Sequence, residues 1–393
     1  MRSFFLAAVT TAAGVALSTT AIAQTETVLW SFPYNSSPYA RLARDSTTGS
    51  LYGTTVHGGV GYGTVFSLSD KHEVWKHHLL YKFGGGSDGA DSYGGLSEDA
   101  TGDLYGTTVY GGNTDVGTAF ELTFNGTSWT HTVLHSFGGG ADGAHPDADL
   151  TIDKATGALY GTTFDGGSWG CGTVFELSPS GTETVLYAFK GGNDGCLPQT
   201  PVRAGSTKGS LYGVTGAGGA QNYGVVYRLK ESLGVWSESV IHTFAGGADG
   251  ENPTDFDVDP KTGDLYGAAG GGSSGNGIVF ELTPAKKDWQ ERVLYTFGGA
   301  PDGVGPVGLH LDAATGVLSG TTYYGGTSGE GTVFQLTKNG NTWVEAQLHS
   351  FGASGDGAYP EARPAEDTTT GYLYGTTTKG GAYNVGTAYL IVP

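Results

Sequence analysis

The sequence contains few residues of several kinds, and each scarcity excludes a class of structure or partner. Its 393 residues include one Met, two Cys and only 19 Lys and Arg against 38 Asp and Glu, for a net charge of −19. A negative field of this size repels polyanions, so we expect no nucleic-acid partner. After residue 23, no apolar run approaches the roughly 20 residues that a membrane-spanning helix needs, so we expect no transmembrane segment in the mature chain.

The first residues have the pattern of a secretory signal peptide. Met1-Arg2 is basic, Phe4 to Leu17 is apolar but short, and Ala21-Ile22-Ala23 is a small-residue cleavage pattern. We therefore predict a signal peptide over residues 1–23, a single mature domain over residues 24–393, and a secreted protein, extracellular or periplasmic.

The only two cysteines, Cys171 and Cys196, are predicted to form a disulfide. In an oxidising compartment an isolated pair forms a bridge more often than a metal site. No further Cys and no nearby His completes a zinc set, so we expect no metal and no cofactor.

Glycine, by contrast, is abundant, and it belongs to a tandem repeat. The 71 glycines recur in an L-Y-G motif followed by a Gly-Gly loop and a G-T-V-F segment. The motif recurs every 52 to 55 residues, and its leucine stands at Leu51, Leu104, Leu159, Leu211, Leu265, Leu318 and Leu373. Self-similarity at such a period indicates a solenoid or a propeller.

Each repeat divides into four short strands, and seven such units predict an all-β, seven-bladed β-propeller with four antiparallel strands per blade. In five repeats a Trp precedes a Phe by eight residues on the fourth strand, so both rings lie on one face and can pack against the next sheet. Residues 25–32 resemble a fourth strand without its first three, and residues 386–390 a third strand without its fourth. We therefore expect the N-terminal strand to join the C-terminal blade and close the ring.

The pattern L-Y-G-T-T-x-x-G-G followed by G-T-V-F resembles the GloVer-type tandem repeat of bacterial secreted choice-of-anchor proteins. The resemblance extends over residues 25–393 and recurs seven times. It implies export and a repeat architecture, and it supplies no catalytic residues.

Candidate functional residues lie where the repeats differ, on the innermost strands that line the central channel. Before the apolar residue of this strand, Arg41 and Arg363 stand in neighbouring repeats, and Asp149 and Asp255 stand on the opposite side. Earlier positions on these strands add further polar or aromatic residues, namely Tyr39, Tyr93, His145, Asp147 and Glu361. We expect a funnel with carboxylates on one wall and guanidinium groups on the other; the alternative is a water-filled channel lined by unspecialised polar side chains.

Outside the channel, two features have a competing structural interpretation. Trp169, in the Gly-rich loop of the third repeat, could stack on a sugar or fill a gap between blades. An Asp that recurs in the connection between repeats is expected to form a turn: Asp88, Asp142, Asp194, Asp249, Asp302 and Asp356.

Three functions fit these features. The first is a monomeric recognition module that binds a neutral glycan or an extracellular protein through Arg41, Arg363, Tyr39, Tyr93 and Trp169. The second is a polysaccharide-active hydrolase or lyase whose catalytic candidates are His145, Asp147, Asp149, Asp255 and Glu361. The third is a structural component of the cell surface. The sequence contains no nucleophile–base or metal motif that would favour the second over the first.

Overall fold

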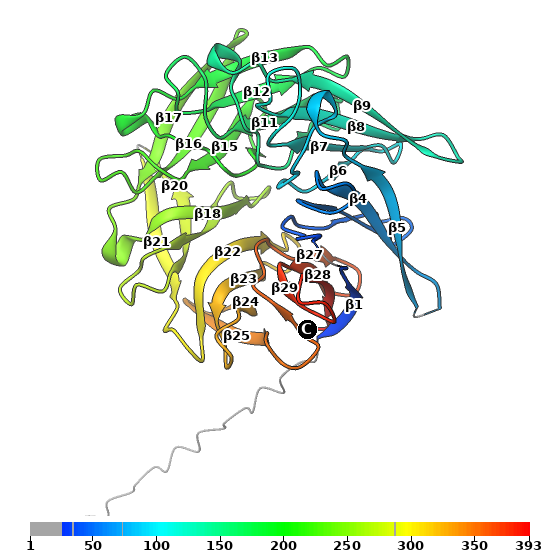
Figure 1. Ribbon diagram of the computed structural model, residues 1–393. Coiled ribbons are helices and arrows are strands. Elements are labelled where there is room, and N and C mark those ends of the chain that lie inside the picture. Colours follow the sequence, from blue (N-terminus) through cyan, green and yellow to red (C-terminus); the bar gives the residue numbers. More distant parts are fainter. Residues whose placement is uncertain (1–25, 34, 73, 287) are drawn as a thin grey trace, which may run out of the picture.

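Seven antiparallel four-stranded sheets surround a central axis, as predicted (Figure 1). The computed structural model describes residues 26–33, 35–72, 74–286 and 288–393, so the predicted signal peptide lies outside the described residues. Within these ranges no helix is both long and apolar enough to cross a membrane.

The four strands of each blade run from the axis to the rim. The innermost strands are β2 (Ala43–Arg44), β6 (Ser97–Glu98), β10 (Thr151–Ile152), β14 (Arg203–Ala204), β18 (Glu251–Val258), β22 (Gly303–Leu311) and β27 (Ala365–Asp367). The second strands, which carry the L-Y-G motif or its variants, are β3 (Leu51–Thr55), β7 (Leu104–Thr108), β11 (Leu159–Thr163), β15 (Ser210–Thr215), β19 (Leu265–Gly270), β23 (Leu318–Gly325) and β28 (Tyr372–Thr377).

In every blade but the sixth, the two outer strands together are longer than the two inner strands. The third strands are β4 (Thr64–Asp70), β8 (Thr118–Phe124), β12 (Thr173–Leu177), β16 (Val225–Ser232), β20 (Ile278–Pro284), β24 (Thr332–Asn339) and β30 (Thr387–Ile391). The outermost strands are β5 (Trp75–Lys82), β9 (Trp129–Ser136), β13 (Glu183–Ala188), β17 (Val235–Thr243), β21 (Trp289–Thr296), β25 (Thr342–Ser350) and β1 (Thr27–Ser31). The remaining elements are the short ribbon of β26 (Gly357–Ala358) and β29 (Lys379–Gly380), and the 3-10 turns η1 (Gly86–Asp88), η2 (Gly140–Asp142), η3 (Gly192–Asp194) and η4 (Gly247–Asp249).

The seventh blade combines the two ends of the chain. Its strand order is β27, β28, β30, β1, and β1 pairs antiparallel with β30 from Thr27 opposite Leu390 to Ser31 opposite Thr387. Figure 1 shows β1, in blue, beside the red C-terminal strands. The contribution of this pairing to the stability of the ring is a free energy that unfolding experiments can measure.

The glycine of the L-Y-G motif is required because an aromatic ring lies directly against it. A Cβ atom on Gly53 would lie 2.6 Å from the Phe66 ring and 2.9 Å from the Leu42 side chain. At Gly161 the corresponding distance to Phe175 is 2.3 Å. No side chain fits at this spacing, so the motif and the G-T-V-F aromatic depend on each other.

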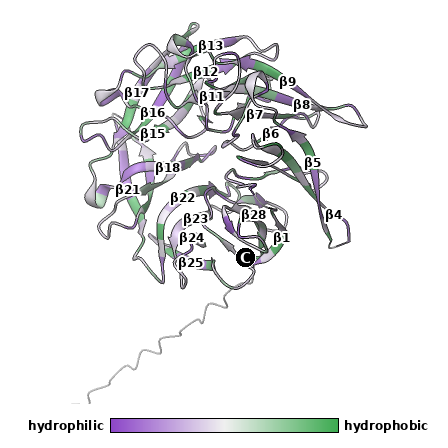
Figure 2. Ribbon diagram, in the orientation of Figure 1, coloured by the Kyte–Doolittle hydropathy of each residue, from purple (hydrophilic) through white to green (hydrophobic). Residues whose placement is uncertain are grey.

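Neighbouring blades are joined by aromatic contacts. The Phe that follows each outermost strand packs edge-on against the third-strand aromatic of the next blade, as between Phe83 and Phe120, with ring centroids 5.2 Å apart. Each Trp of the eight-residue Trp/Phe offset packs against the L-Y-G tyrosine of the preceding blade, as Trp129 does against Tyr52. Both rings pack against a neighbouring sheet, but the prediction that they share one face is wrong. Trp129 contacts the preceding blade and Phe137 the next one, because a β-bulge in the outermost strand reverses the alternation between them. Figure 2 shows the hydrophobic residues along the strands.

The recurrent connection aspartate forms a turn, as predicted. In all six copies one carboxylate oxygen accepts a hydrogen bond from the backbone N–H four residues earlier. The Gly298 N–H, for example, lies 2.7 Å from Asp302 Oδ2. Its repetition thus has a structural cause.

Closure by the N-terminal strand can be tested with two matched leucines. Leu29 on β1 and Leu348 on β25 are 7% and 8% exposed, and both stand three residues before the Phe that follows their strand. If β1 is an integral strand, Leu29→Ala should lower the free energy of unfolding by about 2–4 kcal/mol, as Leu348→Ala should. Urea unfolding measures both changes. If Leu348→Ala lowers the free energy of unfolding by this amount but Leu29→Ala leaves it nearly unchanged, β1 does not hold the ring closed.

Candidate functional site

Eight of the predicted site residues surround one cavity at the axis. The cavity has a volume of about 280 Å³, and its lining includes Tyr39, Arg41, Tyr93, Asp147, Asp149, Asp255, Glu361 and Arg363. These residues precede the innermost strands or lie near their beginning, because each chain segment enters the channel there from the preceding blade. We call the cavity the mouth cavity.

The charged residues at the bottom of the mouth cavity pair across the axis. Arg41 Nε binds Asp149 Oδ2, and Arg363 Nη1 lies 3.1 Å from Asp257 Oδ2. Arg203 Nη2 lies 3.6 Å from Asp255 Oδ1. We call these three arginines and three aspartates the axial ion-pair layer.

This pairing differs from the expected funnel with separate acidic and basic walls. The six side chains are between 9% and 23% exposed, so water solvates each charge poorly. An unpaired charge at such a depth is costly, and opposite charges brought together by seven converging strands lower that cost by pairing. A larger cavity of about 630 Å³ opens on the opposite side of the layer, and Arg41 and Arg203 line both cavities.

Three members of this region were absent from the sequence-based candidates. Each lies two residues after the position that Arg41 and Asp149 occupy in their own repeats: Arg203 follows Pro201, Asp257 follows Asp255, and His310 follows Gly308. Residues i and i+2 of a strand share a face, so the period of two was the signal that could have found them. His310 Nδ1 lies 3.2 Å from Asp257 Oδ2, and His310 Nε2 lies 3.4 Å from Glu366 Oε2.

Two aspartates of the axial layer, Asp149 and Asp257, are held in their charged form. Burial alone would raise the pKa of Asp149, but the adjacent Arg41 guanidinium outweighs it and the pKa is lowered. For Asp257, burial is likewise outweighed by Arg363 and by the hydrogen bond with His310, so its pKa is also lowered. Burial, reinforced by repulsion from Arg363, lowers the pKa of Arg203 to about 10. Asp149, Asp257 and Arg203 are therefore ionised at neutral pH.

The two carboxyl groups nearer the mouth behave in the opposite way. Burial raises the pKa of Asp147 to about 7, and burial also raises the pKa of Glu361 to about 7 despite a hydrogen bond with Tyr323. Asp147 Oδ1 is buried without a hydrogen-bond partner. Asp147 and Asp149 are two residues apart in the segment that precedes β10, yet only Asp149 has a guanidinium group beside it.

Tyrosines surround the opening. Tyr39 and Tyr93 meet edge-on with ring centroids 5.2 Å apart, and Tyr323 and Tyr359 approach to the same distance. The side chains of Tyr93, Tyr110 and Tyr324 remain 37%, 44% and 51% exposed. These tyrosines form what we call the aromatic rim.

The remaining candidates lie outside the mouth cavity. His145 lines an adjoining cavity of about 400 Å³ that shares Tyr93 and Asp147 with the first, and its Nδ1 lies 2.9 Å from Asp165 Oδ1. Trp169 is 64% exposed and lines neither of these two cavities.

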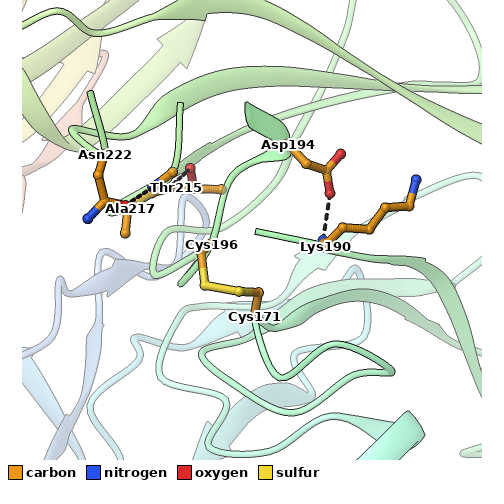
Figure 3. Close-up of a disulfide and its surroundings, with 8 residues drawn as sticks. Cys171, Lys190, Asp194, Cys196, Thr215, Ala217 and Asn222 are labelled. Atoms are coloured by element: carbon orange, nitrogen blue, oxygen red, sulfur yellow. Dashed lines mark hydrogen bonds between the residues drawn. A yellow bond between two sulfur atoms is a disulfide. The ribbon is translucent and has the colours of Figure 1, made fainter. Parts of the chain in front are cut away.

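The structure confirms the predicted disulfide between Cys171 and Cys196 (Figure 3). Cys171 precedes β12, and Cys196 follows η3 in the connection to the next blade. Within this connection the Lys190 backbone N–H binds the Asp194 carboxylate, as Figure 3 shows. The bridge therefore joins a loop of the third blade to a connection that already has the repeated turn.

Removing one charge of the axial layer should destabilise the fold. Asp149→Asn leaves the Arg41 guanidinium half-buried without its counter-charge, so we expect a loss of about 3 kcal/mol at pH 7. Asp147→Asn, in the same segment before β10, removes no ion pair and should cost much less. Urea unfolding of the two variants measures the difference, and equal costs would contradict a structural role for the ion pair.

The raised pKa values predict a loss of stability between about pH 4 and pH 7. A carboxyl group whose pKa is higher in the folded state favours folding below its unfolded pKa, and that contribution is lost as the pH rises through the folded pKa. Asp147→Asn and Glu361→Gln should each reduce this pH-dependent loss in the free energy of unfolding by about 2–3 kcal/mol. The free energies of unfolding at pH 4.5 and pH 8 measure this effect. If both variants lose as much stability between these pH values as the wild type does, the assigned pKa values are contradicted.

Comparison with solved structures supports the fold alone. A Bacteroides uniformis protein assigned as a 6-phosphogluconolactonase aligns with a TM-score of 0.57 and 14% identity, over 87% of this chain and 96% of that one. A hypothetical selenium-binding protein of Sulfolobus tokodaii aligns with a TM-score of 0.54 and 10% identity, over 77% of each chain. At these identities the likeness extends to the architecture and not to the chemistry.

Sequence comparison is more specific. No curated protein matches the sequence. The model of the Gloeobacter/Verrucomicrobia repeat matches residues 37–269 and again residues 206–393, so its two overlapping matches extend over most of the chain. The repeat motif had led us to expect this assignment: the chain belongs to the Gloeobacter/Verrucomicrobia repeat family.

Proposed function

We propose that the protein is an exported recognition module that binds a neutral glycan in the mouth cavity. The observation that carries this proposal is the aromatic rim around two carboxyl groups whose pKa values are near 7. Tyrosine rings offer flat apolar surfaces to the C–H faces of a sugar, and the partly protonated Asp147 and Glu361 can both donate to and accept from its hydroxyl groups.

The charge distribution favours a neutral ligand over an anionic one. The three arginines nearest the cavity already pair with aspartates of the axial layer, so their positive charge is largely compensated. The net charge of −19 repels anions at longer range. This changes the role proposed for Arg41 and Arg363, because they support the floor of the cavity and are poorly placed to bind an acidic sugar.

Export is part of the proposal and rests on two independent features. Residues 1–23 have the composition of a signal peptide, and a disulfide joins Cys171 to Cys196. Disulfides persist in oxidising compartments and are rare in the cytosol.

A hydrolase or lyase is the second candidate, and one specific observation favours it. Carboxyl groups with pKa values near 7 exchange protons readily at neutral pH, which is the property that a general acid or base needs. Asp147 and Glu361 are therefore the strongest catalytic candidates, whereas Asp149 and Asp255 are bound in ion pairs. His145 would act only on a ligand that extends into the adjoining cavity.

Binding can be tested with neutral hexasaccharides, for which we suggest cellohexaose, xylohexaose and mannohexaose. Tyr93→Ala removes an exposed ring of the rim and should weaken binding about tenfold, which corresponds to ~1.4 kcal/mol. Tyr62→Ala is the matched control, because Tyr62 is 45% exposed but does not line the mouth cavity or the adjoining one. Isothermal titration calorimetry measures both, and equal losses in the two variants, or no binding of any hexasaccharide by the wild type, would contradict the proposal.

The same samples distinguish binding from catalysis. Chromatography of each hexasaccharide after prolonged incubation should show intact sugar if the protein only binds. Shortened products that disappear in Asp147→Asn and Glu361→Gln would instead establish the enzyme. Shortened products that persist in both variants would place catalysis elsewhere.

A further inference from the structure

The blade junctions contain a second repeated cluster, far from the axis. At each of six junctions the connection aspartate lies beside a Tyr or His on the outermost strand of its own blade, at a separation of seven residues. The residue type alternates around the ring, with Tyr81, Tyr187 and Tyr295 at three junctions and His135, His242 and His349 at the other three.

Where the residue is His, a Glu that lies on the outermost strand of the next blade, or directly before it, completes a potential metal-binding set. In each set one nitrogen and two carboxylate oxygens lie within 4.8 Å of one another. The three sets are His135 with Asp142 and Glu183, His242 with Asp249 and Glu291, and His349 with Asp356 and Glu26.

The set at the last junction is the most enclosed. The side chains of Glu26, Asp356 and His349 are 3%, 6% and 12% exposed. His349 Nε2 lies 3.0 Å from Asp356 Oδ2 and 4.0 Å from Glu26 Oε2. Glu26 Oε1 is buried with no hydrogen-bond partner, and an unpaired carboxylate oxygen at this depth is unfavourable unless a cation or a proton compensates it.

We propose that Glu26, His349 and Asp356 bind a divalent transition-metal ion of the zinc class. An imidazole nitrogen with two carboxylates is a typical ligand set for Zn²⁺, whereas Ca²⁺ and Mg²⁺ prefer oxygen ligands alone. Three protein ligands leave a fourth position for water. The ion compensates the buried oxygen of Glu26 and the like charges of the two carboxylates.

The position of the ligands gives the ion a structural role. Glu26 directly precedes β1, the N-terminal strand of the seventh blade, whereas His349 lies on β25 and Asp356 lies in the connection that follows it. A metal ion here joins the start of the mature chain to the sixth blade. It therefore reinforces the junction at which the N-terminal strand meets the C-terminal part of the ring.

The tyrosine junctions supply a matched variant. At Tyr295 the phenol O–H donates to Asp302 over 2.9 Å, so the junction is held by a hydrogen bond and has no nitrogen ligand. Tyr295 packs edge-on against Phe297 as His349 packs against Phe351, with centroid distances of 5.1 and 4.8 Å. His349→Tyr thus copies a junction that the protein already contains and should fold.

The test is zinc binding to chelator-treated protein, measured by calorimetry with ZnCl₂ and by the thermal midpoint. We expect His349→Tyr to bind one Zn²⁺ fewer than wild type and to show a smaller rise in the midpoint on zinc addition. Glu26→Gln should reduce both in the same way. His78→Tyr, which changes an exposed histidine on β5, should change neither.

Three results would overturn the proposal. One is that wild type and His349→Tyr bind the same number of zinc ions. Another is that chelator-treated wild type binds no zinc at micromolar concentrations. The third is that CaCl₂ raises the thermal midpoint more than ZnCl₂ does and His349→Tyr retains this effect.

Discussion

The contact on which the ring depends is the edge-on packing of one aromatic side chain against another between adjacent blades. It recurs at all seven junctions with ring centroids 4.9 to 5.3 Å apart. The second ring of each pair lies against the L-Y-G glycine of its own blade, where no side chain fits. The repeat thus encodes an equal spacing between neighbouring sheets. Because the seven sheets are equally spaced around the ring, their innermost strands meet at one axis.

That convergence determines the chemistry of the channel. Strands that meet at an axis expose alternate side chains to a narrow space, and two layers with different electrostatics result. In the deeper layer arginines pair with the aspartates, and the pKa values of Asp149 and Asp257 are lowered. In the layer nearer the mouth Asp147 and Glu361 have no such partner, so burial raises their pKa values and leaves a polar, weakly charged cavity bordered by tyrosines. The proposed glycan site follows from this separation.

Much of the architecture was predictable because it depends on local patterns. The period of the L-Y-G motif predicted the blades, and the two cysteines predicted the disulfide. The eight-residue Trp/Phe offset predicted both rings on one face, which is wrong, because a β-bulge in the outermost strand places them on opposite faces. Eight of the candidate residues were predicted to share a site because the ring places equivalent positions around one axis.

Pairing across the axis was not predictable, because it depends on how far each side chain reaches. The sequence pattern predicts a wall of Arg41 and Arg363 opposite the aspartates, whereas in the structure Arg41 binds Asp149 and Arg363 binds Asp257. The expected absence of a metal rested on cysteines and on residues close in sequence. The set proposed here combines Glu26 with His349 and Asp356, and only ring closure brings these residues together.

The central claim is that Asp147 and Asp149, two residues apart in the segment before β10, belong to different electrostatic layers. NMR titration of the Asp and Glu side-chain carboxyl carbons tests it without any ligand. The account predicts that Asp147 and Glu361 titrate near pH 7, while Asp149 and Asp257 stay ionised to below their ordinary pKa of 3.8. Titration of all four groups near pH 4 would contradict it.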